Sequence, residues 1–390
     1  MLSLLVAAAL SVAQDPGLAE RLKREGWKAV EDLATQPAAK ADLERLAGGD
    51  NRTLKWWAGA ALAELEARER GGAGFIGVLP VTLEAKEKKA HEILSELFAL
   101  EKLRLEGKLT LAEKVQSVSF RAVPFFQAVD EVCREAGCVL RRRTDGAFEL
   151  MPGDGQAGRP DAYAGLLAFT VSSLVFRSTA DFRKDPEQRL ELGLSVRVDP
   201  RAWIRSSMSK WDFVSATDDT GAPLEIRNPG GMGYAAQQPY SFTMKPSLSL
   251  PGKAARKIAS VRGIVSVPIC RDLQELVFSD VVNTPDQTRE VGGIKVTFKQ
   301  LQLEGQTCSV NLEYTPKEAP GAPTLMDLLL EDSGGRRFFG SGGGSTTGLM
   351  YLKFRTPENM KPPERLRVTL MPDLYVRKVY FEIKDIPLHP

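Results

Sequence analysis

Histidine is almost absent from this sequence of 390 residues, which contains only His91 and His389. The first lies in a highly charged stretch and the second is the penultimate residue. A Ser-His-Asp triad or a histidine-rich metal site would have to be built from these two residues. The patterns GxSxG, HExxH and GxxxxGK[ST] are also missing. We therefore predict no catalytic, cofactor-binding or metal-ligating residues, and a protein that is not an enzyme.

An excess of charge of either sign is lacking too. Lys and Arg total 52 against 50 Asp and Glu, which gives a formal charge of +2 spread along the chain. This balance offers no electrostatic footprint for nucleic acid, so no nucleic-acid partner is expected. The only dense basic spot is 141–143, and on a strand its three arginines alternate between faces. That arrangement is typical of a solvated or edge-protecting strand rather than of a phosphate site.

Long hydrophobic runs are confined to the first residues, LSLLVAAALSV at 2–12. This run is too short to cross a bilayer as a helix, and Ser11 and Ala13 supply the small residues that a signal peptidase needs. We predict a signal peptide over 1–13 and a periplasmic or extracellular location, without a membrane span in the mature chain. Because no Lys or Arg precedes the run, a buried first helix and a lipid-free anchor remain alternatives.

Cysteine is scarce, and the four residues allow three complete pairings. In an exported chain the nearby pair Cys133 and Cys138 and the strand pair Cys270 and Cys308 are candidate disulfides. The alternative is that all are buried free thiols that behave as small hydrophobic groups. A CxxxxC spacing without histidine predicts neither a zinc site nor a redox CxxC motif.

Residues 115–152 have the clearest local pattern. Alternation from Val118 predicts a strand. Because the ring of Pro124 pushes Val123 toward extended geometry, we expect the strand to run up to this point and a helix to start after it. Apolar residues then recur at helical spacing from Phe125 to Ala136, and Gly137 suits a left-handed cap. Two further extended runs meet at a turn over 145–146. The unit is predicted to be β-α-β-β.

The core of this unit, SFRAVPFFQAVDEVCREAGCVLRR, resembles the short N-terminal domain shared by secretins and TonB-dependent receptors. The resemblance covers about a tenth of the chain and implies a periplasmic, protein-binding or signal-receiving module over 109–155, with no catalytic residues to transfer. An unrelated small α+β module is the alternative. Nothing after residue 155 resembles the long strands of an outer-membrane barrel.

The segment before this module is helical by pattern. Residues 14–72 predict a helical cap, and DLERLAGGDNRTLKWWAGAALAELEA within 40–67 resembles a single HEAT-type hairpin without further copies. Glycines at 71, 72 and 74 predict a flexible break. The segment 73–108 is interpreted as a linker followed by a long helix over 84–105.

After residue 155 the periodicity changes to two, which predicts antiparallel strands. We expect two Ig-like β-sandwich domains, 160–272 and 273–388, so the whole is a multidomain α+β protein. SATDDTGAPLEI and LLEDSGGRRFF repeat the same hairpin chemistry in the two halves, as a duplication would. One large sandwich is the alternative. The stretch GSGGGSTTG at 340–348 is interpreted as a mobile hairpin loop because it lacks the lysine and helix of a phosphate site.

The predicted function is binding to another envelope or secreted protein through loops or the sheet edge of the small module. Alternatives are a polysaccharide-binding or polysaccharide-hydrolysing protein that uses carboxylate pairs, and a structural envelope component. Asp218 and Asp219 are weighed as calcium ligands against a simple turn-forming role. The candidate binding surface consists of basic and aromatic residues: Arg141, Arg143, Trp203, Tyr234 and Tyr240.

Overall fold

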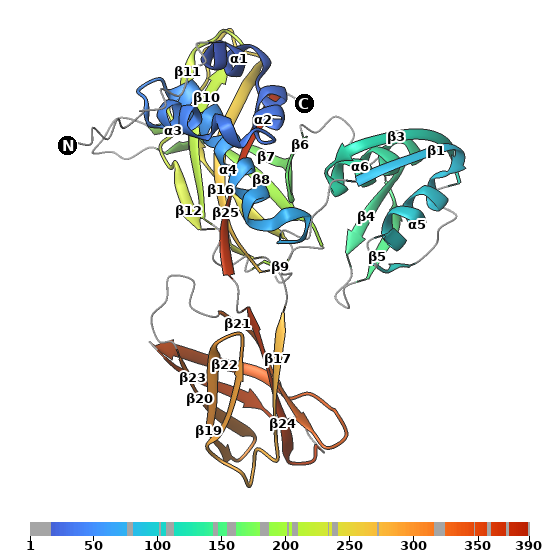
Figure 1. Cartoon of the computed structure of the whole chain (residues 1–390), viewed down its shortest axis with the longest axis vertical. Coiled ribbons are helices and arrows are strands. Elements are labelled where there is room, and N and C mark those ends of the chain that lie inside the picture. The colour runs from blue at the N-terminus through green and yellow to red at the C-terminus, as the bar shows by residue number, and fades with distance from the viewer. Residues whose placement is uncertain are drawn as a thin grey trace, which may run out of the picture. The chain divides into compact units, whose positions relative to one another are not determined.

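A computed structural model places most of the chain in sheets, with helices concentrated toward the N-terminus (Figure 1). The chain divides into two compact units between residues 75 and 76. No helix among the described residues is long and apolar enough to span a bilayer. The structure describes residues 17–75, 81–100, 103–106, 113–142, 147–153, 161–179, 187–200, 203–204, 210–232, 234–235, 241–270, 273–315, 324–346, 348–356, 360–371 and 374–388. The predicted signal peptide lies outside these residues.

The first unit is helical, as the sequence predicts. Gly26 separates the first two helices at a φ of +57°, and a Cβ atom there would lie 3.2 Å from the Trp57 ring. The Asn51 side chain accepts a hydrogen bond of 3.0 Å from the Leu54 N–H and so caps the last helix. The predicted break at 71–74 is wrong, since this helix continues to Phe75. The elements are α1 (Gly17–Glu25), α2 (Trp27–Leu33), the 3-10 turn η1 (Pro37–Ala39), α3 (Lys40–Gly48) and α4 (Arg52–Phe75).

The small module is larger than the predicted β-α-β-β unit. Two helices, α5 and α6, pack against each other, α5 also against β1, and α6 also against β3 and β4. β1 and β3 form an antiparallel two-stranded sheet, and a second sheet has the order β2-β5-β4. The helices share one apolar core with both sheets. The elements are β1 (Val81–Lys89), α5 (Ala90–Leu100), β2 (Leu105–Glu106), β3 (Val115–Val123), α6 (Phe125–Ala136), β4 (Cys138–Arg142) and β5 (Phe148–Pro152).

The helix predicted over 84–105 is only partly correct. Residues 81–89 form strand β1, and the helix begins at Ala90 and ends at Leu100. Glu, Lys and Ala favour helix locally, but β1 pairs along its length with β3, where Ala85 faces Val118. Tertiary pairing therefore overrides local propensity in this segment.

Two antiparallel sheets follow and bury their side chains in one common core. One sheet has the order β13-β14-β8-β7-β6 with β15 beside β8, and the other has the order β11-β10-β16-β25 with β12 beside β10 and β9 beside β16. Phe169 and Phe381 stack across the core with ring centroids 4.3 Å apart. The strands are β6 (Asp161–Ala164), β7 (Leu167–Thr179), β8 (Glu187–Val198), β9 (Trp203–Ile204), β10 (Lys210–Asp218), β11 (Pro223–Leu224), β12 (Gly230–Met232), β13 (Tyr234–Ala235), β14 (Ser241–Met244), β15 (Ser247–Leu248), β16 (Lys257–Cys270) and β25 (Leu374–Pro387).

The last strand, β25, lies in a different sheet from the one expected. The sequence boundaries assign it to the second sandwich, 273–388, but it pairs with β16 from Lys257 to Cys270. The chain therefore leaves the first pair of sheets at Cys270 and returns to it at Leu374. Buried apolar residues alternate at Val265, Val267 and Ile269 of β16 and at Val379, Phe381 and Ile383 of β25, and this alternation alone does not identify the partner strand.

The second pair of sheets has a core of its own. Its sheets have the orders β17-β24-β21 and β18-β19-β20-β23-β22. The stretch predicted as a loop at 340–348 instead forms most of strand β22. The strands are β17 (Gln274–Ser279), β18 (Gln287–Val291), β19 (Ile294–Glu304), β20 (Thr307–Thr315), β21 (Thr324–Asp332), β22 (Phe339–Thr346), β23 (Leu349–Arg355) and β24 (Pro363–Met371).

The two hairpins that repeat in the sequence have the same hydrogen bonds. Asp218 accepts from the N–H groups of Thr220 and Ala222, and Asp332 accepts from those of Gly334 and Arg336. Both aspartates are buried, and each is followed three residues later by a glycine at positive φ. The shared chemistry is therefore a buried carboxylate that fixes a tight turn. The shared turn is consistent with the predicted duplication of the two halves, which stays a prediction.

We predict that Asp218→Asn lowers the melting temperature by several degrees at neutral pH. Hydrogen bonds lower the pKa of Asp218, first from the Thr220 hydroxyl, and then from backbone N–H groups. Because the pKa of Asp218 is lower in the folded protein, its ionised carboxylate stabilises the fold at pH values above the unfolded pKa of about 3.9. This stabilisation is lost as the pH falls through the pKa of the folded protein. The gap between wild type and variant should therefore shrink below about pH 4 in calorimetric scans. Asp212→Asn, an exposed change on the same strand, serves as the control; an Asp218→Asn gap that stays constant with pH would contradict the prediction.

Candidate functional site

The corner between α6 and β4 has the geometry that the sequence predicts. Pro124 precedes the helix in extended conformation, and Gly137 ends it at a φ of +69°. Cys133 on the last turn and Cys138 at the start of β4 are hydrogen-bonded to each other. This bond and burial both raise the pKa of the Cys133 thiol. The chain thus brings two thiols into contact at this corner, as the spacing of the first candidate disulfide suggests.

The three cysteines whose side chains are described, Cys133, Cys138 and Cys308, are buried free thiols. Cys308 contacts the Thr356 hydroxyl at 3.4 Å and lies on β20. The side chain of Cys270 lies outside the described residues, and its backbone belongs to β16 in another sheet. The structure therefore shows thiols at these positions and no disulfide among the three.

Strand β4 is one of the two outer strands of its sheet, with the two-residue strand β2 at the opposite edge. The N–H of Gly153 donates to the Gly137 carbonyl at 3.4 Å. Hydrogen-bonded and non-hydrogen-bonded pairs alternate along an antiparallel ladder, so the backbone N–H and C=O of Leu140 point away from β5. The largely exposed side chain of Arg141 lies on a face of the sheet, 3.4 Å from Glu149, its partner on β5. The edge can accept another strand, and its exposed charge restricts which strands fit.

A cluster of polar and aromatic side chains connects α6 to the neighbouring sheet. Arg197 of β8 donates two hydrogen bonds to Asp130, one of them 3.0 Å long. The Tyr163 hydroxyl donates to the same carboxylate at 2.9 Å. The guanidinium of Arg197 also lies 4.5 Å from the centroid of the Phe126 ring. The cluster holds α6 in a defined orientation on strands β6 and β8.

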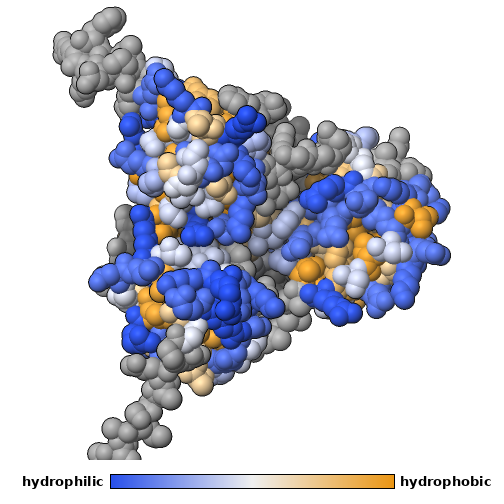
Figure 2. Space-filling view, turned by 90° about the horizontal axis from the view of Figure 1, so that it is seen from above, coloured by the Kyte–Doolittle hydropathy of each residue, from blue (hydrophilic) through white to orange (hydrophobic). Residues whose placement is uncertain are grey.

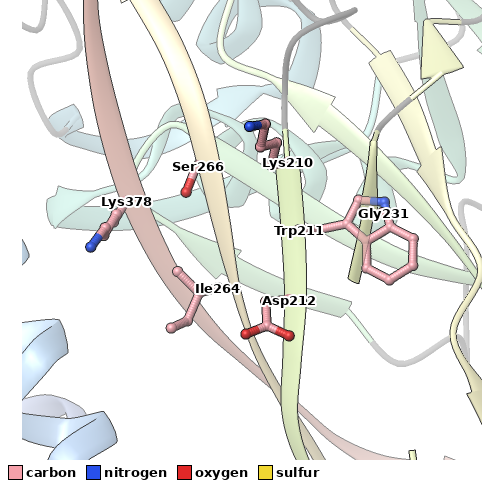
Figure 3. Close-up of a pocket in the computed structure, with 7 residues that line it drawn as sticks. All are labelled: Lys210, Trp211, Asp212, Gly231, Ile264, Ser266 and Lys378. Carbon is pink, nitrogen blue, oxygen red and sulfur yellow. The ribbon is translucent and has the colours of Figure 1, made fainter. Parts of the chain in front are cut away.

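An open hollow of about 410 Å³ lies over β10, β12, β16 and β25. Lys210, Ser266 and Lys378 form a row across three neighbouring strands, as Figure 3 shows. Asp212 is the only carboxylate among the described lining residues, so they offer no carboxylate pair for glycoside hydrolysis. Trp211 belongs to the apolar core and is 7 % exposed, and its ring covers Gly231. It therefore presents little ring face on which a sugar could stack.

The carboxylates considered for calcium have structural roles. Asp218 accepts four hydrogen bonds, from Thr220, Ala222 and Gly252. Asp219 accepts the backbone N–H of Arg256 at 3.1 Å. No group of three or more His, Cys, Asp or Glu side chains suited to a metal ion occurs among the residues that the structure describes. The turn-forming interpretation accounts for Asp218, whereas Asp219 binds the backbone 37 residues further along the chain.

The predicted binding surface can be followed only in part. Arg141 is exposed on β4, as described above. Trp203 and Tyr234 lie in the short strands β9 and β13, but their side chains are outside the described residues. Arg143 and Tyr240 also lie outside them. The Asp130–Arg197 cluster escaped sequence reasoning because nothing in a sequence marks two residues 67 positions apart as neighbours.

The face shown in Figure 2 is mainly hydrophilic, with hydrophobic residues scattered between hydrophilic ones. Comparison with known proteins adds little. No protein-family model matches the chain, and no curated protein matches it. Among solved structures, a conserved domain protein from Bacillus anthracis is similar at 10 % identity over 59 % of this chain and 89 % of its own, with a TM-score of 0.18.

Proposed function

We propose that this chain is an exported, non-enzymatic binding or scaffold protein of the cell envelope that acts through protein–protein contacts. The observation that supports this most is the outer strand β4 of the small module, whose backbone at Leu140 points outward while the other edge of β5 pairs with β2. A partner that adds a strand to such an edge gains backbone hydrogen bonds, and the neighbouring side chains select it. The two sheet pairs, interpreted as Ig-like sandwiches, would then serve as the rigid scaffold.

Site-specific crosslinking tests this proposal. A photoreactive residue at Arg141 should capture one defined envelope protein from the native envelope fraction. The same residue at Glu290, exposed on β18 in another sheet, should not capture it. Leu140→Pro removes the outward N–H and should abolish the crosslink, whereas Leu140→Val keeps that N–H and should retain it. Circular dichroism checks that both variants fold.

Two results would contradict the proposal. One is identical capture from positions 141 and 290, which would indicate non-specific contact. The other is turnover of a polysaccharide by the purified protein, because this would make the chain an enzyme.

A further inference from the structure

Strand β22 is the outer strand of its five-stranded sheet and is unusually bare. Six consecutive residues, Phe339–Gly344, are exposed. Gly340, Gly342 and Gly344 have no atom within 4 Å of the place where a Cβ would be. Phe339 is 67 % exposed at the start of the strand. Glycine in a strand marks a bulge or a place where another backbone approaches closely. The pairing of β22 with β23 shifts between Gly340 and Gly342, and the remaining glycines leave room beside the outer edge.

The opposite edge of the same sheet is built differently. Strand β18 carries Arg289 and Glu290, both exposed, at its centre. Charged side chains on an outer strand restrict which other chains can pair with it. Residues 339–346 contain no charged side chain. One edge of this sheet therefore carries charges that restrict strand addition, and the other carries none.

The outward-pointing backbone groups of β22 can be assigned. The N–H of Tyr314 donates to the Gly348 carbonyl at 3.0 Å. Because successive residues of a strand turn their backbone groups to opposite sides, Leu349, Tyr351 and Lys353 of β23 turn toward β22. Their partners there are Thr346, Gly344 and Gly342. Gly343 and Ser345 consequently turn their N–H and C=O groups outward, to the open edge.

The side chains beside this edge define two different faces. On one face, Lys353 and Arg355 of β23 are exposed and make no ion pair with any described residue. The ammonium of Lys353 lies 5.6 Å from the centroid of the Tyr351 ring on the same strand, and Gly342, opposite Lys353, places no side chain between this cation and the edge of β22. On the other face, Met350 and Leu352 are half-buried at the margin of the apolar core. A strand added at this edge would therefore have basic side chains beside one of its faces and apolar side chains beside the other.

We propose that the open edge of β22 binds an extended segment of a partner protein in which acidic residues alternate with apolar ones. The segment adds a sixth strand to the sheet through the backbone of Gly343 and Ser345. Its acidic side chains face Lys353 and Arg355, and its apolar side chains cover Met350 and Leu352. This site lies in a different sheet from β4 and does not depend on the function proposed for the small module.

Synthetic peptides test this directly. The probe is a capped peptide about seven residues long, the length of a typical strand, with alternating glutamate and valine. We expect it to bind the full chain, measured by fluorescence anisotropy, at least about tenfold more tightly than the matched lysine and valine peptide. Backbone N-methylation of the glutamate peptide should abolish binding, because the added strand can no longer donate hydrogen bonds.

Variants at one position supply the matched controls. Gly344→Ala should retain binding, since the Cβ position is open, whereas Gly344→Glu should weaken it by repelling the acidic peptide. Lys353→Glu combined with Arg355→Glu should reverse the preference between the two peptides. Leu140→Pro on β4 should change none of these results, so this site and the small module are tested separately.

Three outcomes would overturn the proposal. The first is an absence of binding by both peptides, and the second is equal binding of the two. The third is self-association in sedimentation velocity that Gly344→Glu removes, because this would assign the edge to a second copy of the chain.

Discussion

Replacing Phe381 by alanine is expected to lower the free energy of unfolding by about 3–5 kcal/mol, the largest effect of any single change considered. The Phe381 ring is 1 % exposed on β25 and stacks on Phe169 of the opposite sheet. It also meets the edge of Phe213, with centroids 5.7 Å apart. Truncation would leave a cavity between two sheets that cannot collapse onto each other, so the transfer cost and the cavity cost add.

The backbone around Phe381 supports this expectation. Gly263 on β16 pairs with Phe381, and a Cβ atom at position 263 would lie 2.5 Å from the ring. The Phe381 ring thus fills the space beside Gly263. After truncation to alanine, Gly263 has no side chain that could fill this space. The measurement is urea unfolding followed by far-ultraviolet circular dichroism.

The control for Phe381→Ala is Val376→Ala on the same strand. Val376 is 52 % exposed, so its truncation should change stability by no more than about 0.5 kcal/mol. Equal effects of the two changes would show that β25 does not join the core as described. A small loss for Phe381→Ala alone would lead to the same conclusion.

Strand and helix positions were predictable where one periodicity dominates. Strict alternation from Leu190 to Val198 predicts β8, and the apolar stripe from Phe125 with Gly137 at its end predicts α6. These segments bury one face, so the hydrophobic pattern specifies their type and where they end, although β8 begins three residues earlier, at Glu187. The hairpins at Asp218 and Asp332 were also predictable, because aspartate before glycine favours a turn through local hydrogen bonds.

The errors arise where long-range pairing decides the structure. Residues 81–89 are rich in helix-forming residues but pair with β3, and β22 is rich in glycine but pairs with β23. Similarly, nothing local distinguishes the partners of β25. The open edge of β22 was therefore hidden from sequence reasoning, which interpreted its glycines as a loop. The glycine run indicates a strand only when it is considered together with the strand that begins at Leu349 and pairs with it.

Replacing Asp130 by alanine is expected to cost about 1.5–3 kcal/mol, the range for hydrogen bonds to charged groups. Asp130 accepts bonds from Arg197 and Tyr163, and the side chains of Asp130 and Arg197 are only 18 % and 25 % exposed. Without the carboxylate, the guanidinium keeps its desolvation cost and loses its paired charge. The variant should also show faster amide hydrogen exchange in α6, because this helix loses its polar connection to β8.

Glu131→Ala provides the matched control, since Glu131 is exposed on the same helix and has no described hydrogen bond or ion pair. Arg197→Ala completes a double-mutant cycle with Asp130→Ala. If the two side chains act as a pair, the double variant should be less destabilised than the sum of the single variants by about 1 kcal/mol or more. If the losses of unfolding free energy in the two single variants simply add in the double variant, Asp130 and Arg197 have no interaction energy. In that case the shared apolar core of the small module, which extends to Ala168 of β7, would alone hold α6 against the sheet.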